Sequence, residues 1–170
     1  LVNAMSREFT LKNSIREIKD NYDYVLIDCM PSLGMITINA LACSDKIIIP
    51  VQGEYLAAKG MGHLLKTVNR VHKQINPNLK IGGVLLTLVD KRTNLSKDVR
   101  DTINENYGHY VNIYNTEIPK AINTAKSTST GKSIFEFDKN SPVAEAYKNL
   151  AKEVLDNERT RTKNETSKAR

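Results

Sequence analysis

One aspartate follows a short apolar segment and precedes a proline, a position from which a carboxylate can do chemistry. The segment is Tyr22–Asp28, YDYVLID, and Pro31 comes soon after it. A short run of β-branched and apolar residues is typical of a strand covered on both faces, as in a parallel sheet. At the end of such a strand, Asp28 would be able to hold Mg²⁺ through water beside phosphate oxygens. An aspartate before a proline is also a common turn or capping residue, so the pattern alone leaves both interpretations open.

The other residues that bind metals or act as nucleophiles are scattered. Cys29 and Cys43 lie outside any CxxC spacing, so we expect reduced, structural thiols, with a disulfide as the alternative. The histidines, His63, His72 and His109, are not paired with cysteines or carboxylates at ligand spacing, and the sequence does not favour a metal site built on them.

One short motif, Gly131-Lys132-Ser133 within STSTGKS, resembles the end of a Walker A phosphate-binding loop. A Walker A motif needs a glycine five residues before Gly131, where this sequence has Lys126. The segment also lacks a clear buried strand leading into it. We therefore reject it as a phosphate-binding loop.

The elements that must position these residues follow from the apolar pattern. We expect strands at 22–28, 46–51 and 80–89, a short strand within 111–118, and helices at 10–20, 32–43, 54–75, 96–107 and 142–155. Strands that alternate with helices build a parallel sheet with helices on its faces, an α/β fold. Ligands gather beyond the carboxyl ends of such strands, where Asp28, Pro50–Gln52 and Val89–Arg92 would lie.

Length and composition indicate one cytosolic domain. The sequence has 170 residues, of which 40% are hydrophobic, enough for one real core. No apolar run approaches the roughly 18 residues that span a bilayer, and we find no signal peptide. We place the folded part at residues 1–156.

The net charge of +6 is concentrated at the end of the sequence. Residues 157–170, NERTRTKNETSKAR, contain five basic and two acidic residues and no apolar residue larger than alanine. We expect a basic disordered tail, because such a segment buries too little surface to fold. A solubilising role is the favoured interpretation, and a weak electrostatic hold on nucleic acid is the alternative.

Several blocks of the sequence resemble the ParA/Soj family, the deviant-Walker ATPases that partition chromosomes and plasmids. The blocks are YDYVLIDCMPSLGMITINAL, IIIPVQGEYLAAKGMGHLL, INPNLKIGGVLLTLVDKRTNLS, and TEIPKAI with GKSIFEFDKNSPVAEAYKNLAKEVL. They cover about Leu1–Leu155 in unbroken order. One departure is visible, since the family usually has two prolines after the aspartate and cysteine, and here Met30 takes the first place. The resemblance implies a three-layer, P-loop NTPase-like fold with a mostly parallel sheet.

The resemblance also implies a nucleotide site. Asp28 is similar to the family's Walker B aspartate, which organises Mg²⁺ and the hydrolytic water, and Pro31 belongs to the neighbouring switch segment. The implied walls of the adenine pocket are Leu88, Val89, Asp90, Pro119 and Lys120.

A DNA-binding surface is implied by the same resemblance. Arg92 matches a basic family position that contacts DNA without sequence preference, and a second such position falls on Asn123. Lys120, Lys126 and Lys132 are close enough in sequence to compensate. The alternative is that each lysine is an ordinary solvated charge.

The family's phosphate-binding loop, a glycine-rich turn with two lysines, would precede Leu1. We therefore expect the C-terminal part of such an ATPase, lacking its N-terminal strand and P-loop, which alone binds ATP weakly and is inactive. The complete protein would use ATP and Mg²⁺, form a homodimer in the ATP state and bind nonspecific DNA. A ParB-like partner would stimulate hydrolysis, and the protein would be cytoplasmic and nucleoid-associated, with no membrane partner.

Two alternatives remain. The first is a non-catalytic, truncated module that binds DNA or a partner. The second is a MinD-like membrane ATPase, which would need a C-terminal amphipathic helix with an apolar face, and residues 157–170 offer none.

Overall fold

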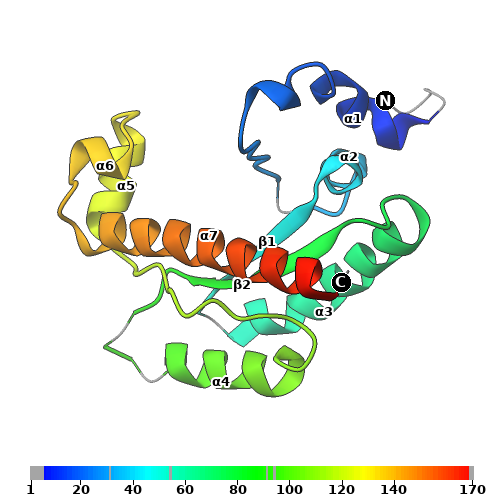
Figure 1. The fold of residues 1–170 in the computed structure, drawn as a ribbon. Coiled ribbons are helices and arrows are strands. Elements are labelled where there is room, and N and C mark those ends of the chain that lie inside the picture. Colours follow the sequence, from blue (N-terminus) through cyan, green and yellow to red (C-terminus); the bar gives the residue numbers. More distant parts are fainter. Residues whose placement is uncertain (1–5, 31, 54, 91, 94, 169–170) are drawn as a thin grey trace. The chain divides into compact units, whose positions relative to one another are not determined.

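The computed structural model describes residues 6–30, 32–53, 55–90, 92–93 and 95–168, with side chains for all of these except 55–59 and 160–168. The chain divides into two compact units, Leu1–Ile47 with Gly60–Ile81, and Ile48–Lys59 with Gly82–Arg170. Figure 1 shows the elements, which in chain order are η1 (Arg7–Phe9), α1 (Thr10–Ile15), η2 (Lys19–Asn21), α2 (Met35–Cys43), β1 (Lys46–Gln52), α3 (Tyr55–Gln74), β2 (Lys80–Thr87), α4 (Leu95–Tyr107), α5 (Ile122–Ser129), α6 (Ile134–Phe137) and α7 (Pro142–Lys168).

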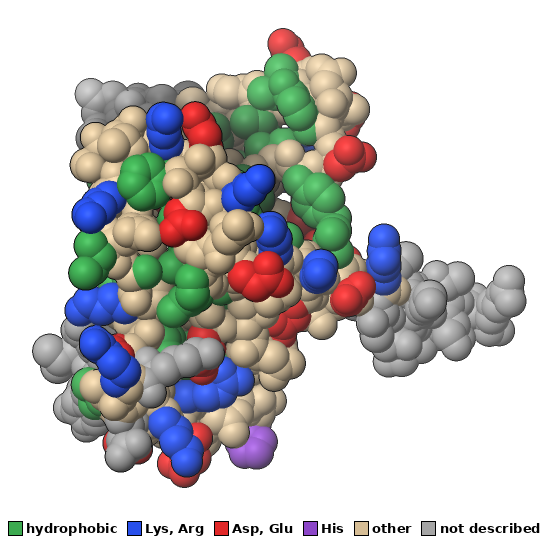
Figure 2. Space-filling model, turned by 90° about the vertical axis from the view of Figure 1, so that its left-hand side faces the viewer, with side chains coloured by type: hydrophobic (Ala, Val, Ile, Leu, Met, Phe, Trp, Pro, Cys, Tyr) green, Lys and Arg blue, Asp and Glu red, His purple; other side chains and the backbone are tan. Residues whose placement is uncertain are grey.

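The surface is mixed in charge. On the face shown in Figure 2, Lys and Arg side chains are spread out among Asp and Glu side chains, and hydrophobic side chains lie between them. None of the helices in the described part of the chain is both long enough and apolar enough to cross a membrane.

Strands β1 and β2 form a parallel pair. Near their starts the Lys80 N–H donates to the Asp45 carbonyl at 3.0 Å, and beyond their ends the Gly53 N–H donates to the Thr87 carbonyl at 3.1 Å. The bonds advance in the same direction along both strands, and α3 makes the crossover that parallel pairing requires. The expected α/β class, a parallel sheet with flanking helices, is confirmed.

The other edge of β2 is paired more sparsely than expected. Val84 bridges to Ile113 and Val89 bridges to Pro119, both in parallel. The strand expected within 111–118 is thus reduced to isolated bridges, and β2 ends at Thr87 rather than at residue 89.

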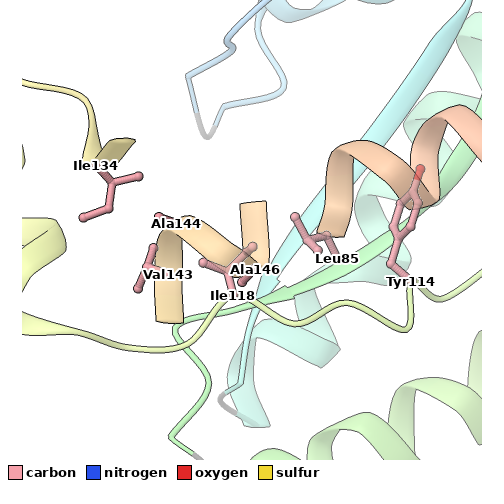
Figure 3. Close-up of a cluster of buried hydrophobic side chains, with 7 residues drawn as sticks. All are labelled: Leu85, Tyr114, Ile118, Ile134, Val143, Ala144 and Ala146. Atoms are coloured by element: carbon pink, nitrogen blue, oxygen red, sulfur yellow. The ribbon is translucent and has the colours of Figure 1, made fainter. Parts of the chain in front are cut away.

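A cluster of buried apolar side chains holds the second unit together, as Figure 3 shows. It joins β2 and the chain after α4 to α6 and α7, through Leu85, Tyr114, Ile118, Ile134, Val143, Ala144 and Ala146. Val84 and Leu86 on β2 are also fully buried. Both faces of β2 are therefore covered, which explains why its sequence reads as a continuous apolar run.

The first unit packs α2 against α3, through Leu41, Val68, Val71 and Leu79. Two buried asparagines tie other segments to α2. Asn39 donates to the Arg7 carbonyl at 2.8 Å and accepts from the Leu11 N–H at 3.1 Å, which holds η1 and α1 on α2. Asn76 donates to the carbonyls at residues 41 and 44, at 2.9 and 2.8 Å, and so caps the C-terminal end of α2.

The expected strand at Tyr22–Asp28 is wrong for this structure. These residues have no regular secondary structure and form no β-bridge with the rest of the described chain. Their side chains are largely exposed, with Leu26 at 92% and Tyr22 at 64%. A strand forms only when a neighbouring segment satisfies its N–H and C=O groups, and apolar composition alone does not supply that neighbour.

The helical boundaries also differ in two places. The helix expected at 10–20 is interrupted, since α1 ends at Ile15 and only η2 follows. The backbone of residues 157–168 is helical, as the end of α7, where we expected disorder. Arg, Lys and Glu are good helix formers, and a helix already anchored by packing extends with one new bond per residue.

Candidate functional site

Five of the predicted nucleotide-binding residues come together at the carboxyl end of β2. The Val89 N–H donates to the Ile118 carbonyl at 3.1 Å, and the Lys120 N–H donates to the Val89 carbonyl at 3.0 Å. These bonds place Leu88, Val89 and Asp90 beside Pro119 and Lys120, although thirty residues separate the two segments.

Leu88 has a strained backbone. Its φ is 52°, in the left-handed region that costs a residue with a Cβ about 1–2 kcal/mol. Its side chain is 46% exposed beside the Val89–Pro119 bridge. Strain of this kind persists where the surroundings impose it and is common at binding sites. The apolar Leu88 side chain is thus displayed at the strand end instead of entering the core.

Asp90 and Arg92 form a bidentate ion pair. The Arg92 Nε–H donates to Asp90 Oδ1 at 2.9 Å, and Nη2–H donates to Oδ2 at 2.7 Å. The Arg92 backbone N–H also donates to Oδ1, at 3.1 Å. The hydrogen bonds from Arg92 hold the pKa of Asp90 well below its usual range, and the Lys120 charge adds to the effect. Asp90 raises the pKa of Arg92 in return.

Of the other candidate DNA-binding residues, Lys120 is exposed before α5, and the rest lie on α5 and after it. Lys126 is exposed in the last turn of α5 and forms no ion pair with the residues described around it. Lys132 lies 3.8 Å from the Glu136 carboxylate. Asn123, at the second basic family position, donates to Asp138 Oδ2 at 2.8 Å, so its side chain joins α5 to the loop before α7.

The GKS motif forms a helix-ending turn. Gly131, with φ of 68°, follows the C-terminal end of α5, and the Lys132 N–H donates to the Ser127 carbonyl at 3.1 Å. The Ser133 hydroxyl accepts from the Glu136 N–H at 3.2 Å and caps α6. A phosphate loop needs such N–H groups free, whereas here they satisfy helix carbonyls and a capping hydroxyl. The geometry agrees with our rejection of this motif.

Asp28 belongs to the first unit and lies in the exposed irregular segment described above. It therefore does not end a strand in this structure. Pro31 lies outside the described residues. Within the described ranges we find no group of three His, Cys, Asp or Glu side chains that would hold a metal ion. Asp28 thus offers one solvent-facing carboxylate.

Both cysteines are free thiols, as expected. Partial burial and then the Asp28 charge raise the pKa of Cys29. Partial burial is also the main cause that raises the pKa of Cys43. Neither thiol is activated as a nucleophile, because the thiolate is disfavoured at both positions.

Sequence reasoning missed two features. The Asp90–Arg92 pair had a signal, an aspartate two residues before an arginine at a strand end, which is the spacing of a local turn. The second feature is Glu153 of α7, whose carboxylate accepts from the Asn115 and Thr116 N–H groups at 2.7 and 2.9 Å. These two hydrogen bonds fix the backbone of the segment that leads to Pro119. No local sequence pattern predicts them.

Comparisons with known proteins agree with the family resemblance. A family model described as an AAA domain matches residues 1–81. The sporulation initiation inhibitor protein Soj of Bacillus subtilis is 47% identical over 157 residues, which cover 92% of this chain and 61% of that protein. The chromosome-partitioning ATPase Soj of Treponema pallidum is 40% identical over 91% of this chain and 60% of its own length.

Solved structures share the fold. Cobyrinic acid a,c-diamide synthase of Mycobacterium smegmatis gives a TM-score of 0.76 at 33% identity, over 91% of this chain and 56% of that one. The structure of the same synthase with bound ADP and magnesium gives a TM-score of 0.66 at 37% identity, over 71% of this chain and 48% of that one.

The chain spans about 60% of the length of the curated relatives it matches. The expected relationship is confirmed over most of the chain. The chain thus matches ParA- and Soj-type partitioning ATPases over most of its own length.

Proposed function

We propose that the chain is the C-terminal portion of an ATPase that partitions chromosomal or plasmid DNA. The protein would dimerise with ATP, bind DNA without sequence preference, and release it when a ParB-like partner stimulates hydrolysis. The identity to Soj supports the class. The observation that carries the proposal is the cluster at the end of β2, which gathers five implied pocket residues from two separate segments.

The cluster suits a nucleobase. Leu88 and Pro119 offer apolar surface beside the polar groups of Asp90 and Lys120, a combination typical of small-molecule sites. The Val89–Ile118 and Lys120–Val89 hydrogen bonds fix the backbone of both walls. We assign these residues to the adenine end of the site.

We assign to Asp28 the Mg²⁺-binding role that the resemblance implies. Mg²⁺ in nucleotide sites keeps several waters and needs only one or two protein carboxylates, so a single exposed carboxylate fits. When bound, the ion would neutralise charge on the phosphate oxygens. Asp28 would hold a water on the ion and orient the attacking water.

Exposed cations would supply the DNA contacts. Arg92, Lys126 and Lys132 all lie at the surface. Contacts to the phosphate backbone do not depend on the base sequence of the DNA. Asn123 is committed to Asp138, so we assign the DNA surface to the lysines and Arg92.

A second candidate is a non-catalytic module that binds DNA or a partner. The GKS turn is the observation behind it, since the Gly131 and Lys132 N–H groups donate to helix carbonyls and are not free to bind phosphates. Such a module would bind DNA equally well with and without ATP.

Turnover separates the two candidates. ATP hydrolysis would be measured with DNA present, in this chain and in any longer protein that contains it. We expect Asp28→Ala to lower kcat about 100-fold, the scale for removing one preorganised group. Asp23→Ala is the matched control, since it removes another exposed carboxylate of the same segment. Equal turnover in both variants would contradict the assignment of Asp28.

A further inference from the structure

Arg92 is both exposed and restrained. Its side chain is 88% exposed, against 29% for that of Asp90. Two guanidinium N–H groups and its own backbone N–H nevertheless donate to the same carboxylate, at 2.7 to 3.1 Å. Long exposed side chains usually sample many rotamers, whereas this one has a fixed partner two residues away.

The loop backbone supports this pairing. The Thr93 N–H and hydroxyl both donate to the Asp90 carbonyl, each at 3.1 Å. The chain thus turns tightly after Asp90, and the turn brings the guanidinium onto the carboxylate. Lys126 and Lys132 differ, because Lys126 has no such partner among the described residues and Lys132 lies 3.8 Å from its own.

Pairing lowers what Arg92 offers to a phosphate. The carboxylate cancels its charge locally and occupies two of the five guanidinium donors. A DNA phosphate must therefore compete with Asp90 for the same group. Arg92 also keeps the pKa of Asp90 far below its usual range, so protonation does not release the arginine at neutral or mildly acidic pH.

We propose that Asp90 is a positioning residue that competes with DNA phosphates for Arg92 and thereby limits the nonspecific DNA affinity of the protein. The inference rests on the proposed DNA-binding role of Arg92. It adds a reason for a carboxylate beside a DNA-contacting arginine: binding that must be reversed is kept weak.

A double-mutant cycle tests this proposal. Affinity for a random-sequence DNA duplex would be measured from 0.05 to 0.3 M salt with ATP and Mg²⁺ present, in wild type, Asp90→Asn, Arg92→Ala and the double variant. We expect Asp90→Asn to bind about 3- to 10-fold more tightly at 0.1 M salt and to steepen the salt slope by about 0.9, as for one added phosphate contact. In the Arg92→Ala background the gain in DNA affinity should fall below about twofold. That is the effect expected from removing a screened surface charge alone.

The matched control is Asp101→Asn. It removes an exposed carboxylate of α4 that forms no ion pair with the described residues, and so makes the same change in net charge. An equal gain from Asp101→Asn, or a gain that persists without Arg92, would overturn the inference. Weaker binding by Asp90→Asn would overturn it as well.

The outcomes separate this inference from the proposed function. If Arg92→Ala leaves DNA affinity and the salt slope unchanged, the assigned DNA surface is wrong and the inference falls with it. If Arg92→Ala weakens binding but Asp90→Asn has no effect that depends on Arg92, the DNA surface stands and the inference alone is refuted. NMR detection of a slowly exchanging Arg92 Nε–H, lost in Asp90→Asn, would report the pair itself without DNA.

Discussion

Gly83 of β2 is a position where a single methyl group should do severe damage. A Cβ added there would lie 2.7 Å from Tyr114 Cε2 and 3.0 Å from the Asn112 carbonyl oxygen. Neither neighbour can yield easily, because Tyr114 is 2% exposed and the Asn112 carbonyl accepts from the Val84 N–H at 2.8 Å. The Gly83→Ala variant must therefore separate the chain around residue 112 from β2.

The loss of stability in Gly83→Ala follows from two opposing contributions. Overpacking a close-packed site costs about 1–3 kcal/mol, and contact with a fixed carbonyl places this site near the upper end. Replacing glycine lowers the entropy of the unfolded chain and returns about 0.4–1 kcal/mol. We expect a net loss of about 2 kcal/mol in the free energy of unfolding.

Urea denaturation followed by circular dichroism measures this loss. With a slope of about 2 kcal/mol per molar urea, the midpoint should fall by about 1 M. Gly60→Ala is the control, since a Cβ there meets nothing within 4 Å on an exposed helical position, and it should raise the midpoint slightly. If Gly83→Ala is as stable as Gly60→Ala, the pairing of β2 with the chain after α4 is not as described.

Three further predictions follow from other contacts. Asn76→Ala should lower the free energy of unfolding by about 2 kcal/mol in urea titrations, since it leaves two carbonyls at the end of α2 unpaired; an unchanged midpoint would refute this capping role. Partial burial raises the pKa of Glu153, but hydrogen bonds from two backbone N–H groups outweigh it and lower the pKa overall. Glu153 should therefore stabilise the fold above the ordinary glutamate pKa of about 4.3, and this contribution should be lost as pH falls through the lower folded pKa. At pH 7 Glu153→Gln should cost about 1 kcal/mol or less, since the side chain is partly exposed, and a loss that does not shrink on acidification would contradict the assignment. Leu88→Asn should raise the urea midpoint, because asparagine tolerates positive φ. The same variant should weaken ATP binding, measured by the fluorescence of a labelled analogue. A lower midpoint with unchanged ATP binding would argue against both roles of Leu88.

The sequence predicted β2 well because that strand is covered on both faces. Its run of apolar residues from Val84 to Leu86 is buried by packing that the chain itself supplies. The Tyr22–Asp28 segment, with its apolar run Val25–Ile27, was predicted in the same way and is largely exposed. The two patterns are alike, and only the presence of a pairing neighbour distinguishes them.

The candidate site was predictable in its members but not in its geometry. Parallel topology and the family resemblance place Asp90 and Lys120 at one strand end. They do not reveal the positive φ of Leu88 or the pairing of Arg92 with Asp90, because both depend on how the turn closes. The helical end of α7 was missed for a different reason, since composition predicted disorder and an anchored helix overrode it.

Retention on nonspecific DNA in different nucleotide states tests the central claim most directly. The protein, as this chain and in any longer form that contains it, would be passed over a DNA-coated surface at 0.1 M salt with ATP and Mg²⁺, with ADP and Mg²⁺, or with no nucleotide. We predict retention with ATP and Mg²⁺ in the longer protein, release with ADP, and loss of retention as salt rises. Equal retention in all three conditions, or none with ATP in any form of the protein, would contradict the account.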